Sequence, residues 1–270
     1  MTRQFLAIPV LAFLLCLYLS PCLAQTAPDT APPQTPNASA TTAQSAPLSA
    51  EDLARLYLVR KEYREAENGF RKLTQQEPKN AVYWNELGIS LHNQMQLTAA
   101  MKCYDKSSKL DSHYADPVNN IGTVWYERKK LAKAIRTYKR AIGIKDGFAP
   151  FYLNLGYAYF ADKKYEESIA AFRKGLQYDP DAFDLSKNHS GTVIQDRSLT
   201  ADRGLFYFLL AKSFAQAGNV DRCLIYLRKA RDEGYKDLTS AKSDPAFAGM
   251  LKNPDIQEVL EPKPPETAQP

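Results

Sequence analysis

Residues 84–91 read WNELGISL, and residues 97–104, after a short polar break, read LTAAMKCY. Both stretches place apolar or small residues three and four positions apart, the spacing that collects them on one face of a helix. Gly88 lies within the first stretch, where the lack of a side chain lets a second helix approach closely. The pair therefore predicts two short helices that cross near Gly88, with Tyr104 filling the volume beside the crossing.

The same pattern recurs every 34 residues on both sides of this stretch, without insertion or deletion over four units. The columns are Leu53, Leu87, Ile121 and Leu155; Ala54, Gly88, Gly122 and Gly156; Ala66, Ala100, Ala134 and Ser168; and Phe70, Tyr104, Tyr138 and Phe172. A fixed period of this length is typical of proteins in which each unit buries its apolar face against its neighbours.

The spacing W-x2-L-G-x2-L at Trp84, Leu87, Gly88 and Leu91, with Ala100 and Tyr104 downstream, resembles the tetratricopeptide repeat. The resemblance implies an all-α fold, a right-handed superhelical solenoid of antiparallel helix pairs. Four contiguous repeats are expected at 47–80, 81–114, 115–148 and 149–182. A fifth is expected at 204–237, after an inserted loop at 183–203. Residues 238–260 are similar to the terminal module of many bacterial members, and should form short capping helices.

In this family the first helix of each repeat lines a concave groove. The inward positions of the second repeat would be Asn85, Glu86, Ile89, His92 and Asn93. Those of the third and fourth would be Asn119, Asn120, Thr123, Tyr126 and Glu127, and then Leu153, Asn154, Tyr157 and Phe160. Asn side chains both donate and accept, so they could bind the backbone of an extended peptide while the aromatic rings hold its side chains.

Two points about this groove stay open. The asparagines either contact a partner or satisfy local groups, and the 183–203 loop either covers one end of the groove or only decorates an edge. Members that clamp a C-terminal carboxylate use Lys and Arg at positions where this chain has asparagines, which disfavours that mode of recognition.

The overall charge is +5, from 35 Lys and Arg against 30 Asp and Glu, so charge alone identifies no partner. The export signal expected at the N-terminus, described below, disfavours a nucleic acid as the partner. One local run is strongly basic: Arg128, Lys129, Lys130, Lys133, Arg136, Lys139 and Arg140. The resemblance places it on the convex side, where a solvated surface is the default. The alternative is peripheral contact with a membrane, an acidic protein or a cell-wall polymer.

The N-terminus has the features of an export signal. Arg3 is followed by an apolar stretch of about 15 residues, too short to span a bilayer comfortably. Small residues before Gln25 predict cleavage after Ala24, and thus a periplasmic or secreted protein. An uncleaved anchor and a lipoprotein acylated at Cys22 are the alternatives. Residues 25–46 are rich in Pro, Ala and Thr, and residues 261–270 are rich in Pro. Both segments should be disordered.

The sequence predicts no enzyme and no cofactor. His92, His113 and His189 have no partner at the spacing of a metal site or a catalytic triad, and phosphate-binding loops are absent. Cys103 and Cys223 lie several repeats apart, too far for a disulfide, and are expected to be packed thiols. The sequence therefore predicts a non-enzymatic scaffold that binds a protein or peptide partner.

Overall fold

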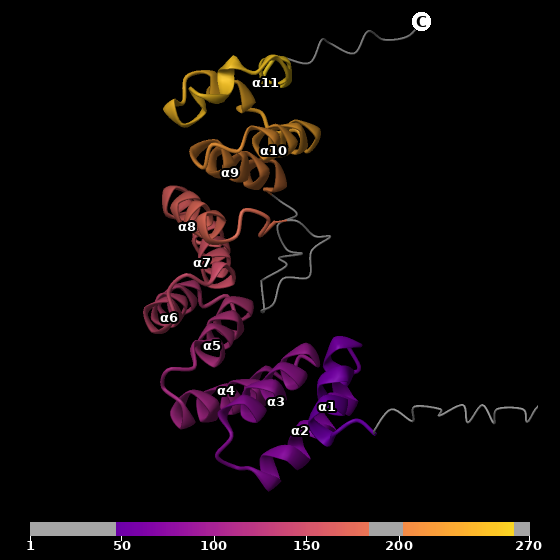
Figure 1. Ribbon diagram of the computed structural model, residues 1–270. Helices are drawn as coiled ribbons and strands as arrows, with labels where there is room; N and C mark the ends of the chain where they lie inside the picture. Colours follow the sequence, from indigo (N-terminus) through magenta and orange to yellow (C-terminus); the bar gives the residue numbers. More distant parts are fainter. Residues whose placement is uncertain (1–46, 184–201, 262–270) are drawn as a thin grey trace, which may run out of the picture. The chain divides into compact units, whose positions relative to one another are not determined.

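The computed structural model describes residues 47–183 and 202–261, and within them every regular element is a helix (Figure 1). The predicted all-α fold of stacked antiparallel helix pairs is confirmed. The pairs are α1 (Ala50–Val59) with α2 (Tyr63–Gln76), α3 (Ala81–Asn93) with α4 (Leu97–Leu110), α5 (Ala115–Glu127) with α6 (Leu131–Ile144), α7 (Ala149–Ala161) with α8 (Tyr165–Tyr178), and α9 (Arg203–Gln216) with α10 (Val220–Asp232).

The segments predicted as an export signal (1–24, with Cys22) and a linker (25–46) lie outside the described residues, as do most of the 183–203 insertion and residues 262–270. Within the described part of the chain, no helix is both long enough and apolar enough to cross a membrane.

Each hairpin turn has one residue in the left-handed backbone region, again with the 34-residue period. Lys61, Met95, Lys129 and Lys163 have φ between 57° and 61°, and Gly218 takes this place in the fifth pair with φ of 75°. The backbone N–H of the residue after it donates a hydrogen bond to the carbonyl five residues earlier, as Gln96 N–H does to the Leu91 carbonyl (3.0 Å). This is the Schellman arrangement that ends a helix and satisfies its last carbonyl groups. The first four turns adopt it without glycine.

The glycine column is where the two helices of a repeat make close contact. A Cβ added to Gly88 would lie 2.5 Å from Tyr104 Cε1, and the same atom on Gly122 would lie 2.6 Å from Tyr138 Cε1. Gly156 faces Phe172 in the same way, at 2.4 Å. Real Cβ atoms do not approach other heavy atoms this closely, so only glycine fits while the ring stays in place. The predicted crossing of helices at these glycines, filled by the aromatic column, is therefore observed.

The C-terminal segment covers the last helix pair with 3-10 turns and one short α-helix. The turns span Leu238–Lys242, Pro245–Phe247 and Met250–Lys252, followed by α11 (Pro254–Val259). The expected short capping helices are thus 3-10 turns before Asn253 and an α-helix only after it, because Pro245 and Gly249 disfavour a continuous α-helix. Phe247, Ile256 and Leu260 are fully buried in one cluster with α9 and α10. These side chains shield the end of the stack.

The two cysteines within the described residues, Cys103 and Cys223, are free and buried. Burial raises the pKa of the Cys103 thiol to about 11 and that of Cys223 to about 12. Both are packed thiols, as the sequence predicts, and neither is activated as a nucleophile.

Candidate functional site

Four asparagines of the predicted groove join the first helices of three successive repeats. Asn120 on α5 donates a hydrogen bond to Asn85 Oδ1 on α3 (3.0 Å), and Asn154 on α7 donates to Asn119 Oδ1 on α5 (2.9 Å). Asn119 donates to Asn120 Oδ1 (3.4 Å), which links the two pairs. Asn85 in turn donates to the Tyr114 hydroxyl (3.1 Å). We call these four asparagines the amide ladder.

The amide ladder follows a simple rule. Each pair that spans two repeats is 35 residues apart, so the fifth position of one repeat meets the sixth position of the next. All four amides are buried, and buried amides need partners of this kind. The hydrogen bonds favour the local role that the sequence left open for these asparagines. Direct contact of the ladder with a partner stays a prediction.

Two more groove residues lie beside the ladder. His92 is buried, with Nε2 2.9 Å from Glu127 Oε2 and Nδ1 3.2 Å from the Tyr104 hydroxyl. His92 and Glu127 are again 35 residues apart, so they connect α3 to α5. Thr123 is buried and accepts a hydrogen bond from the Tyr138 hydroxyl (3.1 Å), which fixes the ring beneath Gly122.

The aromatic end of the predicted groove connects the fourth repeat to the fifth. The Tyr157 ring stacks on Phe206 of α9, with centroids 5.5 Å apart and planes inclined by 19°. Phe160 meets Phe206 edge to face at 5.2 Å. Leu153 is buried in the same cluster. These rings hold α7 against α9, the helices that precede and follow the insertion in the sequence. The sequence does not reveal this contact, because the insertion interrupts the 34-residue period.

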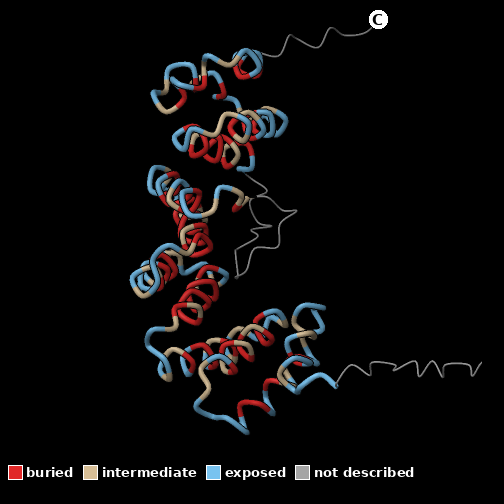
Figure 2. Tube along the Cα trace, viewed as in Figure 1, coloured by how far each residue is buried: buried red, intermediate tan, exposed pale blue. Residues whose placement is uncertain are grey.

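Most of the predicted contact residues are therefore covered in this structure. The buried ones are Asn85, His92, Asn119, Asn120, Thr123, Tyr126, Leu153, Asn154 and Phe160, and Figure 2 shows α5 and α7 as largely buried. Ile89 and Tyr157 are partly exposed, and Asn93 and Glu127 are exposed. Whether any of them contacts a partner stays a prediction.

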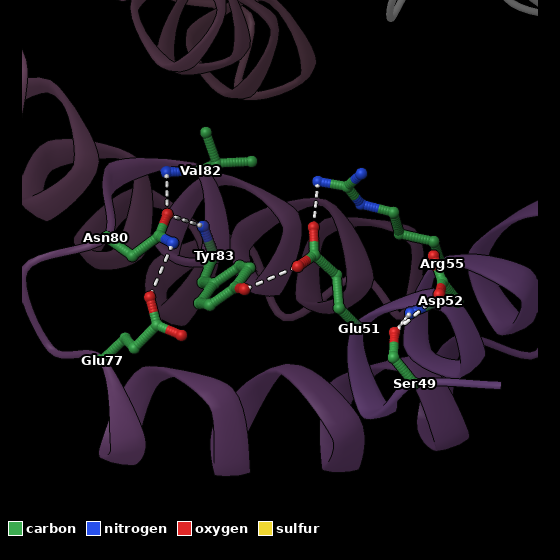
Figure 3. A network of polar contacts seen from close by, with 8 residues as sticks. All are labelled: Ser49, Glu51, Asp52, Arg55, Glu77, Asn80, Val82 and Tyr83. Carbon is green, nitrogen blue, oxygen red and sulfur yellow. Dashed lines mark hydrogen bonds and ion pairs between the residues drawn. The ribbon is translucent and has the colours of Figure 1, made fainter. Parts of the chain in front are cut away.

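A second polar network, at the N-terminal end of the stack, was not apparent from the sequence. The Tyr83 hydroxyl on α3 donates to Glu51 Oε2 on α1 (2.7 Å), and Arg55 pairs with the other oxygen of Glu51 (2.8 Å) (Figure 3). Asn80 caps α3 through the amides of Val82 and Tyr83. The hydrogen bond to Glu51 is the largest cause that raises the pKa of Tyr83 to about 12. The network ties the first repeat to the second.

Two carboxyl groups near the ladder also lie in a partly dehydrated environment. Burial is the largest cause that raises the pKa of Glu86 on α3 and of Asp116 on α5. No group of three or more His, Cys, Asp or Glu side chains in 47–183 and 202–261 is arranged to hold a metal ion.

Comparisons with known proteins agree with this geometry. The family model for the tetratricopeptide repeat matches residues 149–182, the fourth repeat with the bounds that the sequence predicts. No curated protein matches the chain in sequence.

Three solved structures illustrate the likeness. PilF of Pseudomonas aeruginosa has a TM-score of 0.50 and 19% identity over 78% of this chain and 85% of its own. MamA from Desulfovibrio magneticus RS-1 has a TM-score of 0.47 and 18% identity over 68% and 92%. YrrB, described as a repeat protein with an unusual peptide-binding site, has a TM-score of 0.45 and 14% identity over 70% and 88%. The likeness to PilF supports the fold.

Proposed function

We propose that this chain, a tetratricopeptide repeat protein, is an exported, non-enzymatic scaffold that binds an extended peptide or a partner protein along its first helices. One observation carries the proposal: the inward columns of adjacent repeats, separated by 35 residues in the sequence, meet in space through the amide ladder. A repeat array built in this way presents one continuous surface to a ligand rather than several isolated patches.

The side chains that reach solvent along this surface define where a partner would touch first. They are Ile89 and Asn93 on α3, Glu127 at the end of α5 and Tyr157 on α7. The amide ladder lies beneath and fixes the spacing of these helices. In this proposal the buried groove residues act mainly by holding the contact residues in place, because their polar atoms already have partners.

Crosslinking from single positions tests the groove. A photoreactive phenylalanine analogue at Asn93, Glu127 or Tyr157 should capture the same partner in the native cell envelope. The same analogue at Lys102 on α4 or Ile225 on α10, both exposed and on second helices, should not. Equal capture from all five positions would reject the groove as the binding surface.

Replacing Tyr126, Tyr157 and Phe160 together by alanine is a weaker test. Tyr126 and Phe160 are only 3% and 5% exposed. Truncating buried aromatic residues costs about 3–5 kcal/mol each. Loss of binding in that variant would therefore report unfolding as readily as a lost contact.

Export rests on the first 24 residues. If they are a cleaved signal, the mature protein recovered from the native host begins at Gln25 and is found outside the cytoplasm. N-terminal sequencing of the purified protein checks this directly. A chain that retains Met1, or that carries a lipid on Cys22, would replace the proposal with one of the two anchored alternatives.

A second candidate function is that of an envelope assembly or structural factor that contacts membrane or cell-wall polymer through its basic face. The run of cations around α6 favours it. Sedimentation with liposomes or wall material over a salt series provides the test, because contacts between exposed charges weaken as salt rises. Binding that is unaffected by Lys130→Glu and Lys133→Glu would eliminate this function.

A further inference from the structure

The α6 region carries a dense positive charge and no acidic residue of its own. Residues 128–145 contain eight Lys or Arg and no Asp or Glu. Five of these cations are exposed and lie on α6 or at its start: Lys130, Lys133, Arg136, Lys139 and Arg140. We call these five the α6 cations.

Two other second helices contain ion pairs of their own, whereas α6 contains none. Arg71 pairs with Glu67 on α2, and Lys109 pairs with Asp105 on α4. Within residues 47–183 and 202–261, no α6 cation forms an ion pair with a carboxylate. Arg136 and Arg140 lie four residues apart on one helical face, where like charges repel each other.

The cations surround an aromatic recess. A recess of about 290 Å³ between α5 and α6 is lined by Trp125, Lys133, Arg136, Thr137 and Arg140. Trp125 is half-buried, and Lys133 Nζ lies 4.5 Å from the centroid of its ring. No acidic residue lines this recess. It offers an apolar wall with donors around it, which suits a group that has both an alkyl stem and a negative end.

The recess is repeated one unit further along the chain. A second recess of about 510 Å³ on α7 and α8 uses the same repeat positions, with Tyr159 in the place of Trp125 and Lys174 in the place of Arg140, but Glu167 and Ala170 replace Lys133 and Arg136. Lys139 on α6 lies against the Tyr159 ring, with Nζ 5.6 Å from its centroid. The aromatic recess is therefore repeated in the fourth repeat, whereas a lining of three cations without a carboxylate is confined to the α5–α6 recess.

We propose that the α5–α6 face is a second binding surface, for an acidic, extended segment of a partner protein. Its carboxylates pair with Lys133, Arg136 and Arg140, and an aliphatic side chain packs on Trp125. These cations span about 10 Å along the helix, at 1.5 Å per residue. Three residues of extended chain, at about 3.3 Å each, cover the same distance. The inference rests on the scaffold function proposed above and names the chemistry of one partner.

A lipid surface and a single-stranded nucleic acid fit this face less well. Insertion into a membrane interface needs apolar side chains that protrude beside the cations, and cations alone give only a salt-sensitive electrostatic attraction to anionic lipids. The exposed large apolar side chains in the described residues are Leu48, Leu53, Val59, Val82, Met95, Tyr178 and Ile225, none of which is on α6. Nucleic acid bases stack on open aromatic faces. Lys133 and Arg128 already lie over the Trp125 ring, so a base would have to displace them to stack there, whereas a narrower aliphatic side chain can pack beside Lys133 against the part of the ring that lines the recess.

Peptide titration with a matched control tests the proposal. The probe is a fluorescein-labelled peptide with Glu at alternate positions, which share one face of an extended chain, and one Leu; its counterpart has Gln for Glu. Fluorescence anisotropy with the full chain should show binding of the Glu peptide only. Arg136→Gln/Arg140→Gln should weaken that binding by about tenfold or more, since removal of close charge pairs has effects of this size.

The control removes the same charge from the same register one repeat earlier. Lys102 and Lys106 on α4 are exposed and lie 34 residues before Arg136 and Arg140. Lys102→Gln/Lys106→Gln should leave the affinity within about twofold, because screening limits the effect of distant charges. An equal loss in both variants would mean that the peptide responds to net charge alone, and would overturn the site.

Fluorescence locates the contact. The chain has two tryptophans, so Trp84→Phe leaves Trp125 as the only one. Saturation with the Glu peptide should shift or quench the Trp125 emission, and unchanged emission would overturn the recess.

Competition experiments distinguish the other occupants of this face. The proposal would be overturned if phosphatidylglycerol vesicles or an oligothymidylate bound more tightly than the Glu peptide and displaced it. Self-association of the chain through this face would overturn it as well. A variant at Asn93 should bind the peptide normally, so failure here and failure of the groove remain separate results.

Discussion

The contact between Gly122 and Tyr138 gives the sharpest quantitative test of how the repeats are built. In Gly122→Ala the new Cβ would lie 2.6 Å from Tyr138 Cε1, against the 3.5–4.0 Å of a normal carbon contact. Tyr138 cannot move aside easily, because it is fully buried and its hydroxyl is bound to Thr123. Overpacking of this kind costs about 1–3 kcal/mol.

A second glycine provides the reference. Gly143 in the last turn of α6 has no heavy atom within 4 Å of an added Cβ. Gly143→Ala should therefore show only the gain in helix propensity, up to about 1 kcal/mol. Gly122→Ala should have the same gain minus the steric cost, so the two variants should differ in unfolding free energy by about 1–3 kcal/mol.

Urea unfolding followed by circular dichroism measures both variants against the parent chain. Repeating Gly122→Ala in a Tyr138→Leu background, where the ring is absent, should convert the substitution from unfavourable to neutral or favourable. If Gly122→Ala stabilises the parent chain as much as Gly143→Ala does, the glycine column is not a site of close contact and the reasoning is refuted.

Three further predictions follow from single contacts. Met95→Gly should raise the unfolding free energy by about 1 kcal/mol in urea titration, since Met95 is held at φ of 61°, which side chains disfavour; a loss of stability would contradict this turn geometry. Asn120→Ala should cost about 1–3 kcal/mol because it leaves the buried amide of Asn85 without its donor, and a change below about 0.5 kcal/mol would argue against the ladder. The free energy of unfolding should fall as the pH rises from about 10 towards 12. The pKa of Tyr83 is about 12 in the folded chain, beside Glu51, and near 10 in the unfolded chain. The unfolded chain therefore loses the Tyr83 proton at lower pH, which favours unfolding in this range. Tyr83→Phe should reduce this fall, and an unchanged pH profile would count against the hydrogen bond to Glu51.

The fold could be predicted from the sequence because its determinants are periodic. Gly88, Gly122 and Gly156 mark the crossings, and the aromatic residues sixteen positions later fill them. The hairpin turns gave no such signal, since Lys61 and Met95 adopt a conformation usually reserved for glycine or asparagine. The stacking of helix pairs imposes that conformation.

The candidate site was only partly predictable. The 34-residue register identifies the inward-facing positions. It does not show that they are buried, because their burial depends on how the first helices of adjacent repeats pack together. The offset of 35 residues between Asn85 and Asn120 is visible in the sequence once stacking is known. Trp125 was missed because its repeat position reads as core, whereas the cations that follow it leave its ring at the edge of a recess.

The affinity of the purified chain for the partner captured at Asn93, Glu127 or Tyr157 tests the central claim most directly. The account predicts that Ile89→Gln/Asn93→Glu weakens this affinity by about tenfold, the effect of losing roughly 1.4 kcal/mol of contact energy. The same measurement on a variant with substitutions at Lys102 and Lys106, on the outer side of the same repeat, should give the parent value. Equal affinities for all three proteins, with unchanged helical content, would contradict a scaffold that binds along its first helices.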